Sequence, residues 1–278
     1  AIHLKTLNKV QGTLHPKTTD LSKRFRCLAV VLMSFFVLLT SGTASAQNIQ
    51  LYKSYAGNLA FKLNGNSLRN ATNECQALTQ SSSSVSIPAG STLKAAYLYW
   101  SGSGQQDTSV TLNGSQVNAS VTYNLTVDNR NYFSSRADVT SRISANSATY
   151  TVGGLTFDTS QSYCDVASVY GGWALLTIFE NSAQPLRVIN VFDGFRDYYG
   201  SSITLTPNNF VVSDNPSLTQ GQHAHITWEG DAGNSQALNN VSEALTFNGS
   251  NLTDSGNPAG NQFNSYSNTS SSNTSGVD

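Results

Sequence analysis

The sequence predicts an all-β protein, with a β-sandwich or jelly-roll-like fold, and three observations lead to that prediction. Segments of alternating side chains recur along the chain, separated by short turns rich in Gly, Asn and Ser. Two of these segments, 93–100 and 167–180, are apolar on both faces, which indicates strands that are buried on both sides. A helical period is hard to find after residue 47, apart from a turn or two at 137–143 that Asp138 could cap.

The first 46 residues have the features of a secretory signal peptide. Three cations at 23–26 precede an apolar run at 27–39, and Ala44-Ser45-Ala46 forms a small-x-small cleavage signature. An uncleaved anchor is the weaker alternative, because a bilayer span needs about 20 apolar residues. The only methionine, Met33, lies inside the apolar run, so we expect the natural chain to start upstream of this sequence or within it.

Removing the leader changes the charge balance and sets the expected domain boundaries. The leader takes six of the fifteen cations and one of the sixteen acids, which leaves a mature net charge of about −6. Nucleic acid is therefore not an expected partner, because phosphate binding needs clustered Lys and Arg.

We expect one sandwich domain at 47–248 and then a Ser/Asn-rich segment, 249–278, that is a linker or a truncated part of the domain. Membrane attachment is expected only through the leader or an anchor beyond residue 278.

The cysteine count predicts one disulfide. Cys27 belongs to the leader, which leaves Cys75 and Cys164 in the mature chain. In an oxidising compartment these two are most simply bonded, and two unrelated buried thiols are the alternative. By the loop-entropy argument, closing a loop of about 90 residues contributes roughly 4 to 5 kcal/mol.

The alternation in the two strongest strand segments predicts which side chains lie on each face of the strand. In 93–100, one face of the strand carries Leu93, Ala95, Tyr97 and Tyr99, and the other carries Ala96, Leu98 and Trp100. In 167–180, one face carries Trp173, Leu175 and Phe179, and the other carries Ala174, Leu176 and Ile178. Gly171-Gly172 predicts a bulge or a close backbone approach. Segment 186–193 is expected to return as the hairpin partner of 167–180, at the centre of the core. Further strands are expected at 83–87, 108–112, 116–123, 147–157, 203–206, 209–213, 223–229 and 243–248.

One phrase occurs twice, as VTLNGSQV at 110–117 and LTFNGSNL at 245–252. Asn-Gly between apolar runs is the strongest short-range signal for a tight β-hairpin. A Trp-ended segment and a Gly-containing loop precede each copy, which favours two related halves of one sandwich. Duplication and convergence on the same turn chemistry both remain open, because Asn-Gly-Ser arises easily in such a composition.

Acidic loops provide the candidate cation site. Asp193 and Asp197 flank a turn in VFDGFRDYYG, and loop carboxylates are preferred Ca²⁺ ligands. Their spacing is not that of a regular calcium loop, and Arg196 between them could pair with one of them. No cofactor is assigned from the sequence, and calcium is the possibility that these acidic loops raise.

Candidate binding residues lie in the same loop and in WEGDAG. Tyr198 and Tyr199 could present rings to a sugar face, with ordinary edge packing as the alternative. Glu229 and Asp231 are acids that could accompany those rings in a carbohydrate-binding or carbohydrate-degrading site. No set of residues in the sequence has the pattern of a catalytic centre, so no catalytic residue is assigned and a non-catalytic role is favoured.

His223 and His225 alternate along a predicted strand, which would place them on one face about 6.6 Å apart. Two imidazoles so placed can share a metal, and a third ligand would come from another strand. The preferred interpretation is a polar face opposite a core face of Ala224, Ile226 and Trp228.

Three stretches, IPAGSTLKAAYLYWSG, GGWALLTIFENSAQPLRVINVFDGF and ITWEGDAG, resemble a family of exported bacterial surface proteins. Its members carry a large β domain of unknown function, often ahead of immunoglobulin-like repeats or a C-terminal sorting segment. The resemblance spans roughly 87–278 and implies that the chain continues past Asp278. It implies a secreted or cell-surface module with a structural, adhesive or binding role, and surface glycans or cell-surface proteins as partners. It brings no catalytic residue.

Overall fold

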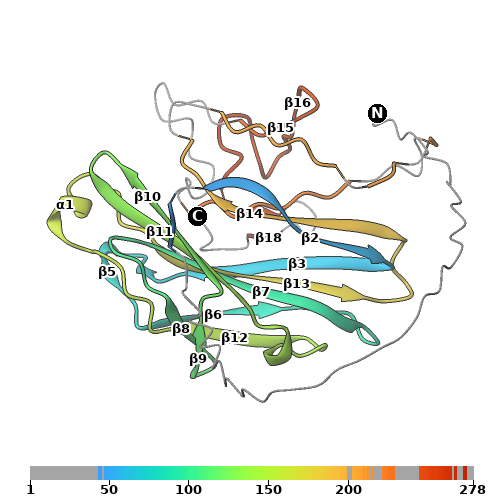
Figure 1. Cartoon of the computed structure of the whole chain (residues 1–278), viewed down its shortest axis with the longest axis horizontal. Coiled ribbons are helices and arrows are strands. Elements are labelled where there is room, and N and C mark those ends of the chain that lie inside the picture. The colour runs from blue at the N-terminus through green and yellow to red at the C-terminus, as the bar shows by residue number, and fades with distance from the viewer. Residues whose placement is uncertain are drawn as a thin grey trace, which may run out of the picture. The chain divides into compact units, whose positions relative to one another are not determined.

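The computed structural model describes residues 43–45, 47–198, 202–208, 210–212, 214–215, 221–228, 244–264, 266–267 and 272–273, and it confirms the all-β prediction (Figure 1). The chain divides into two compact units. The larger unit, 41–209 with 221–278, contains every sheet assigned among the described residues. Of the smaller unit, 1–40 with 210–220, only 210–212 and 214–215 are described.

The larger unit contains two main sheets and a two-stranded ribbon. The six-stranded sheet has the order β1 (Thr43–Ser45), β10 (Val121–Val127), β11 (Arg130–Asp138), β7 (Thr92–Ser103), β13 (Gly171–Glu180), β3 (Leu59–Ser67). The four-stranded sheet has the order β6 (Gln80–Val85), β12 (Ala148–Gly153), β8 (Ser109–Leu112), β9 (Ser115–Asn118). The ribbon pairs β14 (Arg187–Phe195) with β2 (Gln47–Gly57). These pairings are antiparallel except that of β1 with β10.

The remaining elements are short. They are β4 (Arg69–Asn70), β5 (Asn73–Ala77), the 3₁₀ turn η1 (Thr140–Arg142), the helix α1 (Gln161–Cys164), β15 (Thr246–Phe247), β16 (Ser250–Asn251), β17 (Tyr266–Ser267) and β18 (Ser272–Asn273). η1 lies inside the expected helical turn, but its N-cap is Val139 and no side chain caps it. The Asp138 carboxylate instead accepts a hydrogen bond from the Thr140 N–H at 3.0 Å, as in an Asx turn. The sequence reading missed α1.

The main core lies between the six-stranded and four-stranded sheets. Trp100 of β7 and Trp173 of β13 are directly opposite each other in the sheet register, and both are fully buried. Their indole N–H groups donate to the Asp107 carbonyl and the Ser81 hydroxyl, each at 2.9 Å, so neither buried donor is left unsatisfied. The prediction that both segments are central strands is confirmed.

A second core covers the other face of the same sheet. Ala95, Tyr97 and Tyr99 of β7 pack there with Ile178 of β13 and Val191 of β14. Figure 1 shows the β2–β14 ribbon on this side of the six-stranded sheet and β6, β12, β8 and β9 on the other. The six-stranded sheet is therefore the middle layer, which explains why its central strands are apolar on both faces.

One side chain lies on the face opposite to the predicted one. The pairing of β7 with β13 shifts register after Ile178, where Phe179 pairs with Leu93 and Lys94 is passed over. Because one extra residue inverts the alternation of a strand, Leu93 packs with the tryptophan core instead of with Ala95. The predicted faces of the other residues in both strands are confirmed.

The predicted hairpin between 167–180 and 186–193 is wrong in its pairing. β13 pairs with β3 and β7, whereas β14 pairs with β2 in the ribbon. The β3–β13 pair continues into the β2–β14 pair through connections at Asn58 and at 181–186, so the two-stranded unit folds back over the sheet. This topology puts β14 above the sheet, where its side chains meet those of β7, β10 and β11.

Gly171 makes the predicted close approach. A Cβ at this position would lie 2.4 Å from the Phe157 ring, and a Cβ at Gly102 on the neighbouring strand would lie 2.7 Å from the Cβ of Phe157. The alternative, a bulge at this glycine pair, is wrong, because the irregularity of β13 lies after Ile178.

Both Asn-Gly hairpins are confirmed. Asn113-Gly114 joins β8 to β9, and Asn248-Gly249 joins β15 to β16, with positive φ at all four residues as a type I′ turn requires. Only the first hairpin belongs to a larger sheet, whereas β15 and β16 pair with each other. The described residues at 221–228 form no strand ahead of the second copy. Within the described residues, the two copies therefore share the Asn-Gly turn but not a preceding strand.

Several other strand predictions need correction. The described residues of 203–206, 209–213 and 223–229 are not in strands, and the expected strand at 116–123 is two strands, β9 and β10. Strands β2, β3 and β11 were not predicted. β3 does alternate, with Leu59, Phe61 and Leu63 against the second core. In β2 the alternation is interrupted by register shifts in its pairing with β14, so that Tyr52 and Tyr55 pack against the same core.

Candidate functional site

The predicted disulfide is confirmed, because Cys75 and Cys164 are bonded. The bond joins β5 to the end of α1 across 89 residues of sequence. Within the described residues, no helix is long and apolar enough to cross a membrane. The disulfide is compatible with an extracellular protein.

Asp193, a predicted calcium ligand, instead forms a buried ion pair between the ribbon and the sheet. Its Oδ2 lies 2.8 Å from Nε of Arg136 on β11, and each side chain is 7 % exposed. The Tyr123 hydroxyl of β10 donates to the same oxygen at 2.8 Å. Residues from three strands of two layers therefore meet at one carboxylate.

Aromatic rings surround the Arg136 side chain. Its guanidinium lies 3.7 Å from the centre of the Tyr52 ring on β2, a cation–π geometry, and Tyr99 is its cross-strand partner on β7. Burial lowers the pKa of Arg136 and the Asp193 carboxylate raises it, and the net result is a raised pKa. Burial, followed by the hydrogen bond to Asp193, raises the pKa of Tyr123 to about 12.

The contacts of Asp193 with Arg136 and Tyr123 indicate a structural role for this side chain. Both of its strong contacts come from protein donors, and its side chain faces the middle sheet, whereas Asp197 is exposed. Arg196 does not pair with Asp193, because it donates to the Asn48 side chain at 3.0 Å. Asp193 is thus a structural anchor of the ribbon, with its Oδ2 held by Arg136 and Tyr123. The calcium site with Asp197 stays a prediction.

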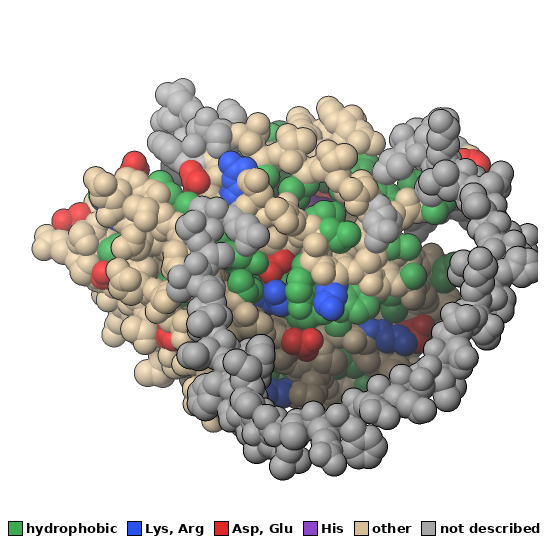
Figure 2. Space-filling view, in the orientation of Figure 1, with side chains coloured by type: hydrophobic (Ala, Val, Ile, Leu, Met, Phe, Trp, Pro, Cys, Tyr) green, Lys and Arg blue, Asp and Glu red, His purple; other side chains and the backbone are tan. Residues whose placement is uncertain are grey.

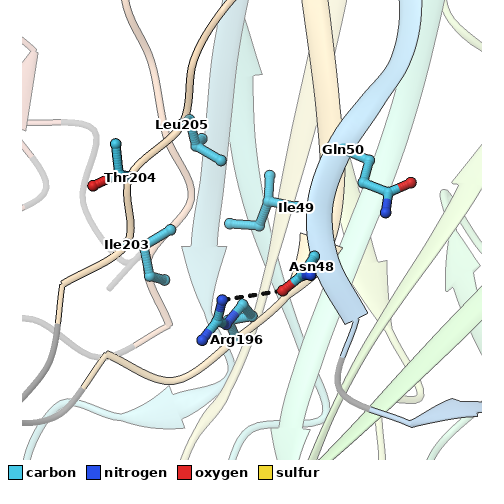
Figure 3. A pocket seen from close by; sticks show the side chains of 7 residues that line it. All are labelled: Asn48, Ile49, Gln50, Arg196, Ile203, Thr204 and Leu205. Atoms are coloured by element: carbon cyan, nitrogen blue, oxygen red, sulfur yellow. Dashed lines mark hydrogen bonds between the residues drawn. The ribbon is translucent and has the colours of Figure 1, made fainter.

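A shallow pocket of about 370 Å³ lies beside the start of β2 (Figure 3). Its lining consists of Asn48, Ile49, Gln50, Arg196, Ile203, Thr204 and Leu205. Figure 3 shows Ile49 pointing toward the 203–205 segment, while Gln50 points to the other side of the strand. Arg196 lies at the rim in contact with Asn48, so the pocket has an apolar wall and one cation.

Tyr198 belongs to a cluster of rings from three segments. Its ring centre lies 5.6 Å from that of Phe263, which lies 4.9 Å from that of His225 in an edge-on arrangement. Tyr199, Glu229 and Asp231 lie outside the described residues, so the structure places one of the four predicted binding residues. Ile226 and Trp228 pack against the second core, as the phase of 223–229 predicted, although the segment is not a strand. The prediction is wrong for Ala224, which is exposed.

The outward side chains of the four-stranded sheet are neutral and polar, and a cation, Arg142 of η1, borders them at β9, where it donates to the Gln116 carbonyl at 2.7 Å. The inward side chains of this sheet, among them Val110, Tyr150 and Val152, belong to the main core. By alternation, the outward positions are Gln80, Ser82, Ser84, Ser109, Thr111, Gln116, Asn118, Thr149 and Thr151. Hydroxyls pair across β6 and β12, Ser82 with Thr151 at 2.7 Å and Ser84 with Thr149 at 2.8 Å. We call these nine residues the hydroxyl face.

The rest of the visible surface has a related character. Figure 2 shows one side of the molecule, on which neutral polar side chains and backbone predominate and charged side chains are few and scattered. Charged residues make up 11 % of the chain, so a face of nine neutral residues follows partly from composition. The amino-acid composition does not explain why the hydroxyl groups form hydrogen bonds across the strands.

The sequence reading missed both Arg136 and the hydroxyl face. Arg136 could have been noticed as a lone cation in an otherwise uncharged stretch, YFSSRA, because a buried charge needs a partner of opposite sign. The hydroxyl face has a weak signal, the SSSS run at 81–84.

Comparison with known proteins finds no match to the chain among protein-family models, curated proteins or solved structures.

Proposed function

We propose that the chain is a secreted or cell-surface β-sandwich module with a non-catalytic, adhesive or binding role. The observation that carries this proposal is the hydroxyl face, a nine-residue surface of Ser, Thr, Asn and Gln on a rigid sheet. The partner that suits this face is a neutral surface glycan, because both surfaces offer hydroxyl donors and acceptors and neither carries charge.

The chemistry of the face indicates how such binding would work. A hydroxyl contact exchanges one hydrogen bond with water for another, and its net contribution is only about 0.5 to 1.5 kcal/mol. The cross-strand pairs hold Ser82, Ser84, Thr149 and Thr151 in fixed positions, which lowers the entropy lost on binding. Useful affinity then requires many repeats on one partner, so an extended polysaccharide fits better than a short oligosaccharide.

Export is supported by two independent features. The Cys75–Cys164 bond is of a kind that persists in oxidising compartments. The leader with its Ala44-Ser45-Ala46 signature supplies a route to such a compartment. Cleavage before Gln47 stays a prediction, and it would remove β1 from the edge of β10.

A carbohydrate-binding or carbohydrate-degrading site in the 193–200 loop is the second candidate. The placement of Tyr198 beside Phe263 and His225 favours it, because clustered rings can stack on a sugar. The two candidates use different surfaces and can therefore be separated by mutation.

A glycan array tests the proposal. The full chain should bind neutral polysaccharides, and Ser82→Glu with Gln116→Glu should abolish binding by placing two carboxylates on the hydroxyl face. Gln161→Glu, an equivalent change on exposed α1, is the matched control and should bind normally. Loss of binding in Tyr198→Ala with retention in the double variant would instead support the second candidate.

A further inference from the structure

The chain contains few histidines, and two of them lie close together. The sequence contains four histidines, of which His3 and His15 belong to the expected leader. The other two, His223 and His225, are separated by one residue, and the structure brings their rings into contact, with centres 5.2 Å apart. The segment 221–227 is not in a strand, although the two rings lie side by side as the alternation of His223 and His225 predicts.

The facing nitrogens have the separation of two ligands on one metal ion. Nε2 of His223 lies 3.2 Å from Nδ1 of His225. With metal–nitrogen bonds of 2.0 to 2.1 Å, that separation corresponds to an angle of about 100° at the metal, close to the tetrahedral value of about 109°. We propose that His223 and His225 chelate one late first-row divalent metal ion through these two nitrogens, a site independent of the hydroxyl face.

The ring of His225 is held in place by its surroundings. Phe263 packs edge-on against it at 4.9 Å, and Tyr198 packs on Phe263 at 5.6 Å. These contacts come from segments distant in sequence, so the orientation of the imidazole does not depend on the 221–228 segment alone. A ligand whose orientation is fixed beforehand loses less conformational entropy when the metal binds.

The donor set limits which metals fit. Two imidazoles favour Cu²⁺, Ni²⁺ and Zn²⁺ over Ca²⁺ and Mg²⁺, which prefer oxygen. Among the described residues there is no group of three or more His, Cys, Asp or Glu side chains. The described protein residues therefore supply two ligands, and water would complete the coordination of the ion.

A hydrogen bond between the two rings is the competing explanation for the same distance. In that case one nitrogen carries a proton and donates to the other, and the pair binds no metal. Chelation requires both facing nitrogens to present lone pairs, so the two explanations predict different nitrogen chemical shifts when metal is added.

The experiment is a calorimetric titration of the full chain with Zn²⁺, Cu²⁺ and Ca²⁺, in a Cys27→Ser background that removes the leader thiol. We expect one Zn²⁺ or Cu²⁺ ion per chain and no Ca²⁺. His223→Ala and His225→Ala should each weaken binding by more than about tenfold. His3→Ala with His15→Ala is the matched control and should bind as the parent does.

A second measurement reads the nitrogens directly. In ¹⁵N-labelled protein, Zn²⁺ should shift Nε2 of His223 and Nδ1 of His225, and leave the other nitrogen of each ring less affected. Absence of binding, equal binding by the His223→Ala and His225→Ala variants, or a shift of other nitrogens would overturn the proposal. Unchanged near-ultraviolet circular dichroism of both variants shows that lost binding is not lost folding.

Discussion

Arg136 and Asp193 form an ion pair that is buried between the middle sheet and the ribbon, with 2.8 Å between Nε and Oδ2. Removing one partner of a buried pair leaves an uncompensated charge and typically costs about 3 to 5 kcal/mol. We therefore expect Asp193→Asn to lower the free energy of unfolding by that order in chemical denaturation.

The exposed pair Lys94–Glu180 is the matched control for the buried one. Its charged atoms are 2.7 Å apart, but the side chains are 40 % and 39 % exposed. Solvent screening leaves such a pair worth about 0 to 1 kcal/mol, so Lys94→Met should change stability little. Similar effects of Asp193→Asn and Lys94→Met would show that burial of Asp193 is not what makes it important.

The tyrosines around Arg136 predict a loss of stability at alkaline pH. Burial raises the pKa of Tyr97, Tyr99 and Tyr123, and that of Tyr123 reaches about 12. A raised pKa means that the folded state holds the proton more tightly than the unfolded state, in which tyrosine titrates near 10. Their contribution is therefore complete below about pH 10 and is lost as the pH rises through 12 and beyond.

The alkaline prediction is checked by measuring unfolding free energy against pH together with tyrosinate absorbance. Stability should fall above about pH 10, and the fall should be shallower in Tyr123→Phe. If all tyrosines ionised near pH 10 while the protein remained folded, the buried cluster would be contradicted.

Gly171 allows the core packing to be tested with a single methyl group. A Cβ would approach the Phe157 ring to 2.4 Å, so Gly171→Ala should destabilise the protein by about 1 to 3 kcal/mol. A Cβ at Gly221 would meet nothing within 4 Å, so Gly221→Ala is the control and should be close to neutral. Thermal denaturation of both variants against the parent is sufficient, and equal melting temperatures would refute the close packing.

The disulfide should stabilise the fold substantially. Cys75→Ser with Cys164→Ser should cost about 2 to 5 kcal/mol, measured by denaturant unfolding without reductant. Cys27→Ser should have no effect, because that thiol lies outside the bond. A double variant as stable as the parent would mean that the bridge closes a loop already fixed by other contacts.

Local patterns predicted the parts of this fold that depend on nearby residues. The two-faced segments around Trp100 and Trp173 and the Asn113-Gly114 turn have strong alternation or turn chemistry, so their strands and hairpin were found. The cysteine count found Cys75–Cys164, because two thiols in an oxidising compartment allow one bond.

Contacts between side chains of different layers could not be predicted from local patterns. Asp193 and Gly194 form an Asp-Gly pair, which favours a turn, yet Gly194 lies within β14, with φ of 154° and its backbone against β2 at Ile49. The partner of Asp193, Arg136, is 57 residues earlier, and no local pattern links the two. The same limit applies to His225, whose contacts with Phe263 and, through it, Tyr198 join segments that are distant in sequence.

The central claim is that the module binds a neutral partner through the hydroxyl face, and co-sedimentation with an insoluble neutral polysaccharide tests it most directly. Because the face carries no charge, the bound fraction of the full chain should be the same at about 0.05 M and about 0.5 M salt. It should fall to background in Ser82→Glu with Gln116→Glu and stay at the parent level in Gln161→Glu. Binding that decreases with salt, or that survives the two carboxylates on the face, would contradict the account.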